Sequence, residues 1–322
     1  MTEFELIARY FTRPNRTALL GNGDDCAIVA PSAGNAFAVT TDTLIVGRHF
    51  LPTLAPFKLG RRVVNVNLSD LAAIGAEPRY ALLSLTLPQI DEDWISQFSS
   101  GLWSVLDAHG VELIGGNTTK GPLAVAMTAF GELPPLAALK RSGARAGDEL
   151  WVSGTLGDAG WAMYALTSAK FEATPEQIGK YESPEARVSL GLALRGIASS
   201  CIDISDGLLS EAKHIATASK VSIDIAIKAV PTGLASALQG RQYASLAQHC
   251  LLATGDAYEL LFTAPRDQHD AVAAILQHEN LPGACIGRVT ASGEGNAANA
   301  VRVLDAQSRV MDIEVKGWDH FA

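Results

Sequence analysis

Residues 56–75, PFKLGRRVVNVNLSDLAAIG, contain the stretch that decides the first half of the fold. Leu59, Val63, Val66 and Leu71 recur at the spacing of one buried helix face, and the glycine that ends the stretch is a typical stop signal. The pattern predicts a helix that begins near residue 56 and packs its apolar side against a sheet.

Polar side chains near the end of this helix form a second pattern. Asn67 and Asp70 are three residues apart, so both can project from one side of the helix. The motif 67–71, NLSDL, recurs in type as 203–207, DISDG, which indicates two related halves. Chance or common capping chemistry also produces such a short echo, and this alternative stays open.

The elements predicted around this helix mix strands with helices. In the first half we expect strands at 27–30, 36–41, 80–87, 111–114 and 124–131, and helices at 3–11 and 91–109. In the second half we expect a strand at 149–153, helices near 157–168 and 184–199, and strand, helix and strand through 201–227. The turn-rich, basic segment 133–148 separates them. The prediction is a two-domain α/β (α+β) fold with domains 1–138 and 139–322.

Composition limits the classes of function. The chain has 322 residues, of which 48% are hydrophobic and 18% charged, as in folded proteins long enough for two domains. Its net charge of -9, without a Lys/Arg-rich stripe, argues against nucleic acid as a partner. The four cysteines form no CxxC pair, so we expect reduced thiols. The start of the chain lacks signal-peptide features, and no apolar run approaches the roughly 18–20 residues of a membrane span, so we expect a cytoplasmic protein.

Acidic motifs lie far apart in the chain, each where a loop should join regular structure. They are 23–25 (GDD), 40–42 (TTD), 68–70 (LSD) and 203–207 (DISDG). Mg²⁺ prefers oxygen ligands and bridges a few carboxylates to substrate phosphates, so the motifs predict a multi-metal phosphate site. The alternative is that they are ordinary helix caps and turns, where Asp, Ser and Thr are also favoured.

Candidate phosphate-binding segments differ from the familiar ones, because the chain has no GxxxxGK[ST] loop and no HRD or DFG element. Residues 114–121, IGGNTTKG, follow a predicted buried strand and offer backbone N–H groups, hydroxyls and a lysine to a polyphosphate, although a simple glycine turn explains them too. Residues 153–158, SGTLGD, favour a structural turn. Arg141 and Arg145 are candidates for a phosphate clamp, with solvated linker charge as the alternative.

Several motifs together resemble one family, the thiamine-monophosphate kinases, whose superfamily includes aminoimidazole ribonucleotide synthetase. They occur in order over nearly the whole chain: GDDCA, TTDTL, HF, VNLSDLAAIGA, LIGGNTT, RSGA, IDISDG, GDAYELLFT and KGWDHF. The resemblance implies an aminoimidazole ribonucleotide synthetase-like fold, with an N-terminal mixed-sheet domain that dimerises and a C-terminal α/β domain. It also implies ATP bound among several Mg²⁺ ions and the conversion of thiamine monophosphate to thiamine diphosphate.

The resemblance also implies roles for individual residues. Metal ligands would be Asp25, Thr40, Thr41, Asp42, Asp70, Asp203 and Asp206. ATP would be held by Gly115, Gly116, Arg141 and Ser205. Thiamine monophosphate would be bound by His49, Asp256 and Trp318. A cationic thiazolium ring suits an aromatic face and a carboxylate.

Two positions depart from the family pattern. Asn117 occupies the place of an aspartate in the metal- and ATP-binding motif, and its amide oxygen can bind Mg²⁺ but brings no charge. Ala257 stands where an acidic residue is common. We expect direct transfer of the γ-phosphate without a covalent nucleophile or essential base. The alternatives are another ATP-using enzyme of the superfamily, or a non-catalytic Mg-nucleotide-binding protein if Asn117 impairs turnover.

Overall fold

The computed structural model describes residues 2–293 and 298–313. The chain divides into two compact units. The first comprises Met1–Leu71 and Ala76–Leu136, and the second comprises Ala72–Gly75 and the chain from Ala137 onward. The change of unit after Leu136 lies within the turn-rich segment 133–148. The short segment Ala72–Gly75 groups with the second unit although it contains the end of the helix predicted from residue 56.

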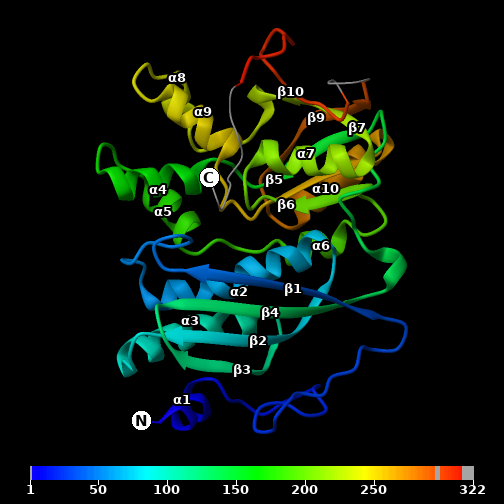
Figure 1. Cartoon of the computed structure of the whole chain (residues 1–322). Coiled ribbons are helices and arrows are strands. Elements are labelled where there is room, and N and C mark those ends of the chain that lie inside the picture. The colour runs from blue at the N-terminus through cyan, green and yellow to red at the C-terminus, as the bar shows by residue number, and fades with distance from the viewer. Residues whose placement is uncertain (1, 294–297, 314–322) are drawn as a thin grey trace. The chain divides into compact units, whose positions relative to one another are not determined.

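The first unit is built on a mixed sheet of four strands (Figure 1). Its strands are β1 (Ala36–Ile45), β2 (Glu77–Leu87), β3 (Glu112–Lys120) and β4 (Ala124–Leu133), in the order β1-β4-β2-β3. β4 pairs antiparallel with β1 and β2, whereas β2 and β3 are parallel. The predicted mixed sheet is therefore confirmed.

Helices α2 (Pro56–Ala73) and α3 (Glu92–Ala108) cover one face of this sheet, and the short α1 (Glu3–Tyr10) precedes it (Figure 1). The helix predicted from residue 56 is confirmed, and each of its four periodic apolar residues is at most 2% exposed. Asp91 begins α3 as predicted, because its side chain accepts a 3.0 Å hydrogen bond from the Trp94 amide.

Two glycines allow α2 and α3 to approach backbone to backbone. A Cβ atom on Gly101 of α3 would lie 1.9 Å from the carbonyl oxygen of Phe57 in α2. A Cβ atom on Gly60 of α2 would lie 2.1 Å from the carbonyl oxygen of Phe98 in α3. Neither position has room for a side chain, so the packing of this helix pair depends on both glycines.

The second unit contains a six-stranded sheet in the order β10-β7-β9-β5-β8-β6 (Figure 1). Its strands are β5 (Glu149–Ser153), β6 (Ser200–Asp203), β7 (Val221–Ala226), β8 (Leu260–Ala264), β9 (Gly283–Ala291) and β10 (Val301–Leu304). Every neighbouring pair is antiparallel except β10 with β7. The core of this unit is formed by aliphatic side chains of the sheet and of the helix that follows β6.

The helices of the second unit are α4 (Asp158–Ser168), α5 (Pro175–Glu182), α6 (Val188–Ala193), α7 (Leu208–Ser219), α8 (Ala235–Gln239), α9 (Ala244–Ala253) and α10 (His269–His278). α7 follows β6 directly, so the acidic segment 203–207 joins a strand to a helix. Among the residues that the structure describes, none of the helices combines the length and the apolar character needed to cross a bilayer.

Two of the predicted elements need correction, and one helix was missed. Residues 27–30 form no strand; Ile28 makes a single bridge to Leu20 and is half exposed, since four apolar residues without a partner strand cannot form a ladder. The helix expected over 184–199 is only α6, Val188–Ala193. α5 was not predicted, although the capping box of Thr174 and Gln177 was a readable signal for its start.

The helix contact gives a prediction for stability. We expect Gly101→Ala to lower the free energy of unfolding by roughly 1–3 kcal/mol, because the new methyl group must force α2 and α3 apart. The gain in helix propensity from Gly to Ala, about 1 kcal/mol, is too small to offset this. Urea unfolding followed by tryptophan fluorescence measures the change.

Gly179→Ala in α5 is the matched control, because a Cβ atom there would have no neighbour within 4 Å among the described residues. We expect this variant to be as stable as the parent or more stable by up to about 1 kcal/mol. A Gly101→Ala protein as stable as Gly179→Ala would contradict the close packing of α2 and α3.

Candidate functional site

The first group of candidate residues lies where β1 faces α2. Side chains alternate along a strand, so Thr40 and Asp42 point to the same face of the sheet. Thr40 Oγ1 donates a short hydrogen bond to Asp70 Oδ2 of α2, and the Asp42 amide donates a 3.2 Å bond to Asn67 Oδ1 of the same helix. The structure thus brings together three of the predicted metal ligands, and Asn67 lies on the same side of α2 as Asp70.

Thr41 points to the opposite face of the sheet. Its hydroxyl donates a 3.1 Å hydrogen bond to the Met127 carbonyl oxygen and accepts one of 3.1 Å from the Thr128 hydroxyl of β4. The side chain of Thr41 therefore does not join those of Thr40 and Asp42. Asp25 lies in an exposed loop before the sheet.

His49 belongs to a tight loop that follows β1. Its backbone amide donates to the Ile45 carbonyl oxygen at 2.9 Å, and its Nδ1 accepts a 3.1 Å hydrogen bond from the Ile45 amide. Phe50 beside it is 3% exposed and anchors the loop in the core of the unit. An Nδ1 that accepts carries no proton, so the neutral ring has its proton on Nε2.

The segment predicted to be a flexible phosphate loop is instead the continuation of a strand. Residues 115–120 pair in parallel with 82–87 of β2 after a bulge, so half of their backbone groups are used in the ladder. β3 is the edge strand of its sheet, and the outward N–H and C=O groups are not part of that ladder. Gly116 must be glycine, because its φ is 148° and a Cβ atom would lie 1.8 Å from the Leu83 carbonyl oxygen. Asn117, next to it, is exposed.

In the second unit the acidic segment 203–207 connects β6 to α7. Asp203 is the last residue of β6 and is 5% exposed, whereas Asp206 is half-buried. The Asp206 amide donates a 3.1 Å hydrogen bond to Glu211 Oε1, in the first turn of α7. Gly207 has a φ of 117°, and a Cβ atom on it would meet the backbone of Ala253 at 2.7 Å.

A second backbone segment, residues 255–259, runs beside this one. The amides of Asp256 and Tyr258 donate 2.9 Å hydrogen bonds to the carbonyl oxygens of Ser205 and Ile204. The Ile204 amide returns a 2.8 Å bond to the Glu259 carbonyl oxygen. The structure therefore brings the predicted residues Ser205 and Asp256 side by side, although they are far apart in the sequence.

Glu211 was missed by the sequence reasoning. It is 2% exposed, its Oε1 accepts from Asp206, and its Oε2 has no hydrogen-bond partner among the described residues. Burial, together with the negative charges of Asp206 and Asp203, raises the pKa of Glu211 to about 8 although the Asp206 amide opposes the shift. The sequence signal for Glu211 was its position about one helical turn after the acidic motif. This signal is weak, because acidic residues are common in the first turn of any helix.

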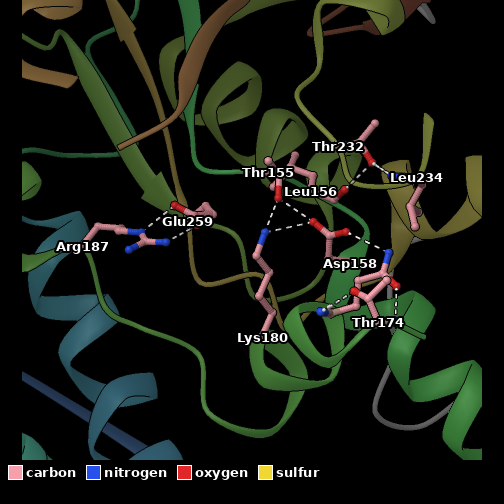
Figure 2. Close-up of polar contacts among 10 residues, drawn as sticks. Thr155, Leu156, Asp158, Thr174, Lys180, Arg187, Thr232, Leu234 and Glu259 are labelled. Atoms are coloured by element: carbon pink, nitrogen blue, oxygen red, sulfur yellow. Dashed lines mark hydrogen bonds and ion pairs between the residues drawn. The ribbon is translucent and has the colours of Figure 1, made fainter. Parts of the chain in front are cut away.

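The segment 153–158 is a structural turn, as the sequence favoured. The carboxylate of Asp158, the first residue of α4, accepts hydrogen bonds from Thr155 at 2.5 Å, Lys180 at 3.0 Å and Gln177 at 3.3 Å (Figure 2). An acid of the chain itself therefore occupies this helix start. Arg141 is exposed, and the predicted substrate-binding Trp318 lies outside the described residues.

The donors around Asp70 fit a hard divalent cation, because they are carboxylate, hydroxyl and amide oxygens without nitrogen or sulfur. Within residues 2–293 and 298–313, no three His, Cys, Asp or Glu side chains gather closely enough to hold a metal ion by themselves. Mg²⁺ commonly takes only one or two carboxylates and completes its shell with phosphate oxygens and water. The residues present therefore suit Mg²⁺ that arrives with a phosphate ligand.

Comparison with known proteins identifies similar chains over the full length. Residues 23–133 match the N-terminal domain of AIR synthase related proteins, and residues 145–299 match the C-terminal domain. The thiamine-monophosphate kinase of Escherichia coli O157:H7 is 40% identical over 99% of this chain and 98% of its own.

Solved structures are similar as well. The crystal structure of thiamine-monophosphate kinase from Stenotrophomonas maltophilia K279a is 39% identical, has a TM-score of 0.82 and covers 93% of this chain and 94% of its own. A structure of AaThiL complexed with AMPPCP and TMP is 31% identical, has a TM-score of 0.76 and covers 91% of this chain and 89% of its own.

The burial of the cysteines predicts their reactivity. Cys26 is exposed next to Asp25, whereas Cys201 and Cys250 are buried, and burial raises the pKa of the Cys250 thiol to about 12. The thiolate is the reactive form, so iodoacetamide at pH 8 should modify Cys26 in the folded protein and leave the two buried thiols intact. Mass spectrometry of peptides over time measures this.

The same reaction in guanidinium chloride is the control, since all the thiols should then react. Alkylation of Cys250 as fast as Cys26 in the folded protein would contradict the described burial.

Proposed function

Since the chain belongs to the AIR synthase related family, and within it to the thiamine-monophosphate kinases, we propose that it transfers the γ-phosphate of ATP to thiamine monophosphate. The products are ADP and thiamine diphosphate. A relative that is 31% identical is known in complex with AMPPCP, an analogue of ATP, and TMP, which supports this pair of substrates.

One observation carries the proposal beyond family membership. Thr40 and Asp42 of β1 meet Asp70 and Asn67 of α2, so oxygen donors from two motifs gather on one face of the sheet. Acidic residues that serve only as helix caps or turns would not need contacts between β1 and α2, because a cap residue hydrogen-bonds to the backbone of its own helix. The arrangement favours the phosphate-site interpretation of the acidic motifs over the capping interpretation.

We assign the substrate contacts from the family motifs. ATP is held by the backbone of Gly115 and Gly116, by Asn117, by Arg141 and by the Ser205 hydroxyl. The exposed edge of β3 and the exposed side chain of Arg141 suit this role, since both offer donors to phosphate oxygens. Thiamine monophosphate contacts His49, Asp256 and Trp318. The Nε2 proton of His49 is a suitable donor to the substrate phosphate.

The transfer is direct. An oxygen of the acceptor phosphate attacks the γ-phosphorus of ATP in line, the bond between this phosphorus and the β–γ bridging oxygen breaks, and ADP leaves. The attacking oxygen is already anionic near neutral pH, so the protein needs neither a nucleophile nor a general base. Its residues act by orienting two phosphate groups and by supplying donors to their oxygens.

Magnesium ions, when bound, would screen the repulsion between the two phosphate groups. The ligands that we propose are Asp25, Thr40, Asp42, Asp70, Asn117, Asp203 and Asp206, with Thr41 contributing its backbone carbonyl. The uncharged amide of Asn117 lowers the negative charge of this set by one relative to an aspartate, which suits a site that also receives anionic phosphates. If Asn117 prevents turnover, the chain is a non-catalytic Mg-nucleotide-binding protein.

Asp42 gives the test of the site. We expect Asp42→Asn to lower kcat by about 10²-fold or more. The substitution removes the negative charge of a proposed metal ligand, and the bound cations are what screens the repulsion between the two phosphate groups. Chromatographic measurement of ADP and thiamine diphosphate, with ATP, thiamine monophosphate and varied Mg²⁺, provides the rates. Thermal unfolding checks that the variant is folded.

Asp107→Asn is the control, because Asp107 is an exposed acid of the same unit that pairs with Arg13 at 2.8 Å. Its turnover should equal that of the parent. Equal turnover of Asp42→Asn and Asp107→Asn would remove Asp42 from the site.

We also propose that two copies of the chain associate through the open face of the four-stranded sheet. α2 and α3 cover the face to which Thr40 points, so Val39 and Ile45 of β1 point to the other face, where they are 58% and 43% exposed. Half-buried Leu82 of β2 and Phe130 of β4 continue this apolar surface. In a symmetric dimer each copy would bury this same apolar surface of the other copy.

The double variant Val39→Lys/Ile45→Lys tests the association. We expect it to have the mass of one chain in light scattering after gel filtration, whereas the parent has twice that mass, because four buried lysines would meet across the contact. Leu136→Lys, at a fully exposed apolar residue outside the sheet, should keep the parent mass. A parent protein with the mass of one chain would contradict the dimer.

A further inference from the structure

Glu259 forms a buried ion pair that the family motifs do not assign. Its side chain is 3% exposed, and that of Arg187 is 17% exposed. Arg187 Nε donates to Glu259 Oε2 at 2.8 Å and its Nη2 donates to Oε1 at 2.5 Å, so the guanidinium and the carboxylate meet edge to edge (Figure 2). This two-bond geometry fixes the direction of the carboxylate as well as its distance.

Ser153 completes the surroundings of this carboxylate. Its hydroxyl donates a 2.6 Å hydrogen bond to Glu259 Oε2 and accepts a 2.9 Å bond from the Leu260 amide. Gly154 follows with a φ of 62°, and a Cβ atom there would lie 1.9 Å from Glu259 Oε1. A side chain at position 154 would therefore collide with this carboxylate.

Glu259 ends a segment whose backbone is under constraint. Asp256 and Tyr258 have φ angles of 63° and 51°, the left-handed region that residues with side chains rarely adopt. In this conformation their amides reach Ser205 and Ile204, and a Cβ atom on Gly255 would lie 1.7 Å from the Ser205 carbonyl oxygen. Such a conformation persists only where neighbouring contacts enforce it.

Contacts at the Glu259 end of the segment help to enforce it. There the segment continues into β8, where Leu260 pairs with Asp203. At the same end the Glu259 side chain is clamped by Arg187, and its carbonyl oxygen accepts the Ile204 amide at 2.8 Å. A shift of Glu259 would therefore be passed to the acidic segment 203–206 through the hydrogen bond from the Ile204 amide to the Glu259 carbonyl oxygen.

We propose that Arg187 is a positioning residue, which holds segment 255–259 in its left-handed conformation through Glu259 and thereby fixes the backbone of Ser205 and Asp206. The inference rests on the proposed function for the role of those two residues, but the clamp itself is a property of the second unit alone. Arg187 touches no reacting group in this account, and its effect on turnover is exerted through Glu259.

Arginine is required for this role rather than any cation. A lysine at 187 would offer a single ammonium that can reach one oxygen of Glu259 but cannot hold both in a plane. Arg187→Lys should therefore keep the charge balance while loosening the direction of the carboxylate. Arg187→Met removes both the charge and the two hydrogen bonds, and within the part of the chain that the structure describes it leaves Ser153 as the side-chain partner of Glu259.

The experiment compares Arg187→Met, Arg187→Lys and Arg302→Met. Arg302 is the matched control, because it pairs at 2.6 Å with Asp224, another carboxylate that is 5% exposed in the same sheet. Asp224 lies on β7 near the opposite edge from β8, and it keeps Arg288 at 3.4 Å when Arg302 is removed. Both variants therefore remove an arginine from a buried carboxylate, although Asp224 keeps a second arginine and Arg302, at 44% exposed, is less buried than Arg187.

Two readouts separate positioning from stability. The first is kcat for thiamine diphosphate formation, which we expect to fall by about 10- to 100-fold in Arg187→Met and less in Arg187→Lys, since small displacements of aligned groups have effects of that size. The second is amide hydrogen exchange of the ligand-free protein, which should accelerate in segments 203–207 and 254–260. Arg302→Met should keep both at parent values.

The outcomes are distinct. A kcat within twofold of the parent in both Arg187 variants overturns the proposal, and so does a lower kcat with unchanged exchange in the two segments, because Arg187 would then act on the reaction without positioning them. An equal loss in Arg302→Met overturns it as a general stability effect. If Arg187→Met does not fold, Arg187→Lys decides by the same criteria. A parent without turnover contradicts the proposed function, whereas the exchange comparison still decides for or against the clamp.

Discussion

Repulsion between neighbouring carboxylates is the constraint on which the candidate site depends. Acids that are brought close together in a partly buried place separate or take up protons unless hydrogen bonds or cations hold them. In this protein the fold supplies the hydrogen bonds: Thr40 binds Asp70, Asn67 holds the backbone of Asp42, and Arg187 binds Glu259. Glu211 is held less completely: burial first, and then the charges of Asp206 and Asp203, raise the pKa of its carboxyl group, and one of its oxygens has no hydrogen-bond partner among the described residues. We infer that the negative charge of these carboxylates that is not balanced by hydrogen bonds would be balanced by cations that bind together with phosphate.

Periodicity predicted the elements that carry their own signal. The helix from residue 56 has a long apolar face, and the helix at 92–108 has an aspartate at its cap, so both were found with their starts. Residues 27–30 have the same apolar character but no neighbouring strand, and the presence of a partner cannot be read from four residues. The sequence also did not predict that β3 extends to Lys120. The pairing with β2 causes this extension, whereas the glycines at 115 and 116 locally favour a turn.

The candidate site was predicted in its motifs but not in its supports. Acidic residues next to glycine at strand ends were visible in the sequence, and so was the place of Asn67 beside Asp70. The ion pair of Arg187 with Glu259 joins residues that are 72 positions apart, and no local pattern marks either as a partner of the other. The left-handed conformation of Tyr258 contradicts the local preference of its residue type, so tertiary contacts are needed to explain it. The side of the sheet to which Thr41 points follows from strand alternation, once the strand is known to extend through Ile45.

The central claim is that the chain moves one phosphoryl group from ATP to a phosphate acceptor. Phosphorus-31 NMR of the purified protein with equimolar ATP and thiamine monophosphate in the presence of Mg²⁺ tests it most directly, because every phosphorus atom is followed at once. The account predicts that the signals of ADP and thiamine diphosphate grow at the same rate, without inorganic phosphate. An unchanged ATP spectrum, or release of inorganic phosphate while thiamine monophosphate stays intact, would contradict it.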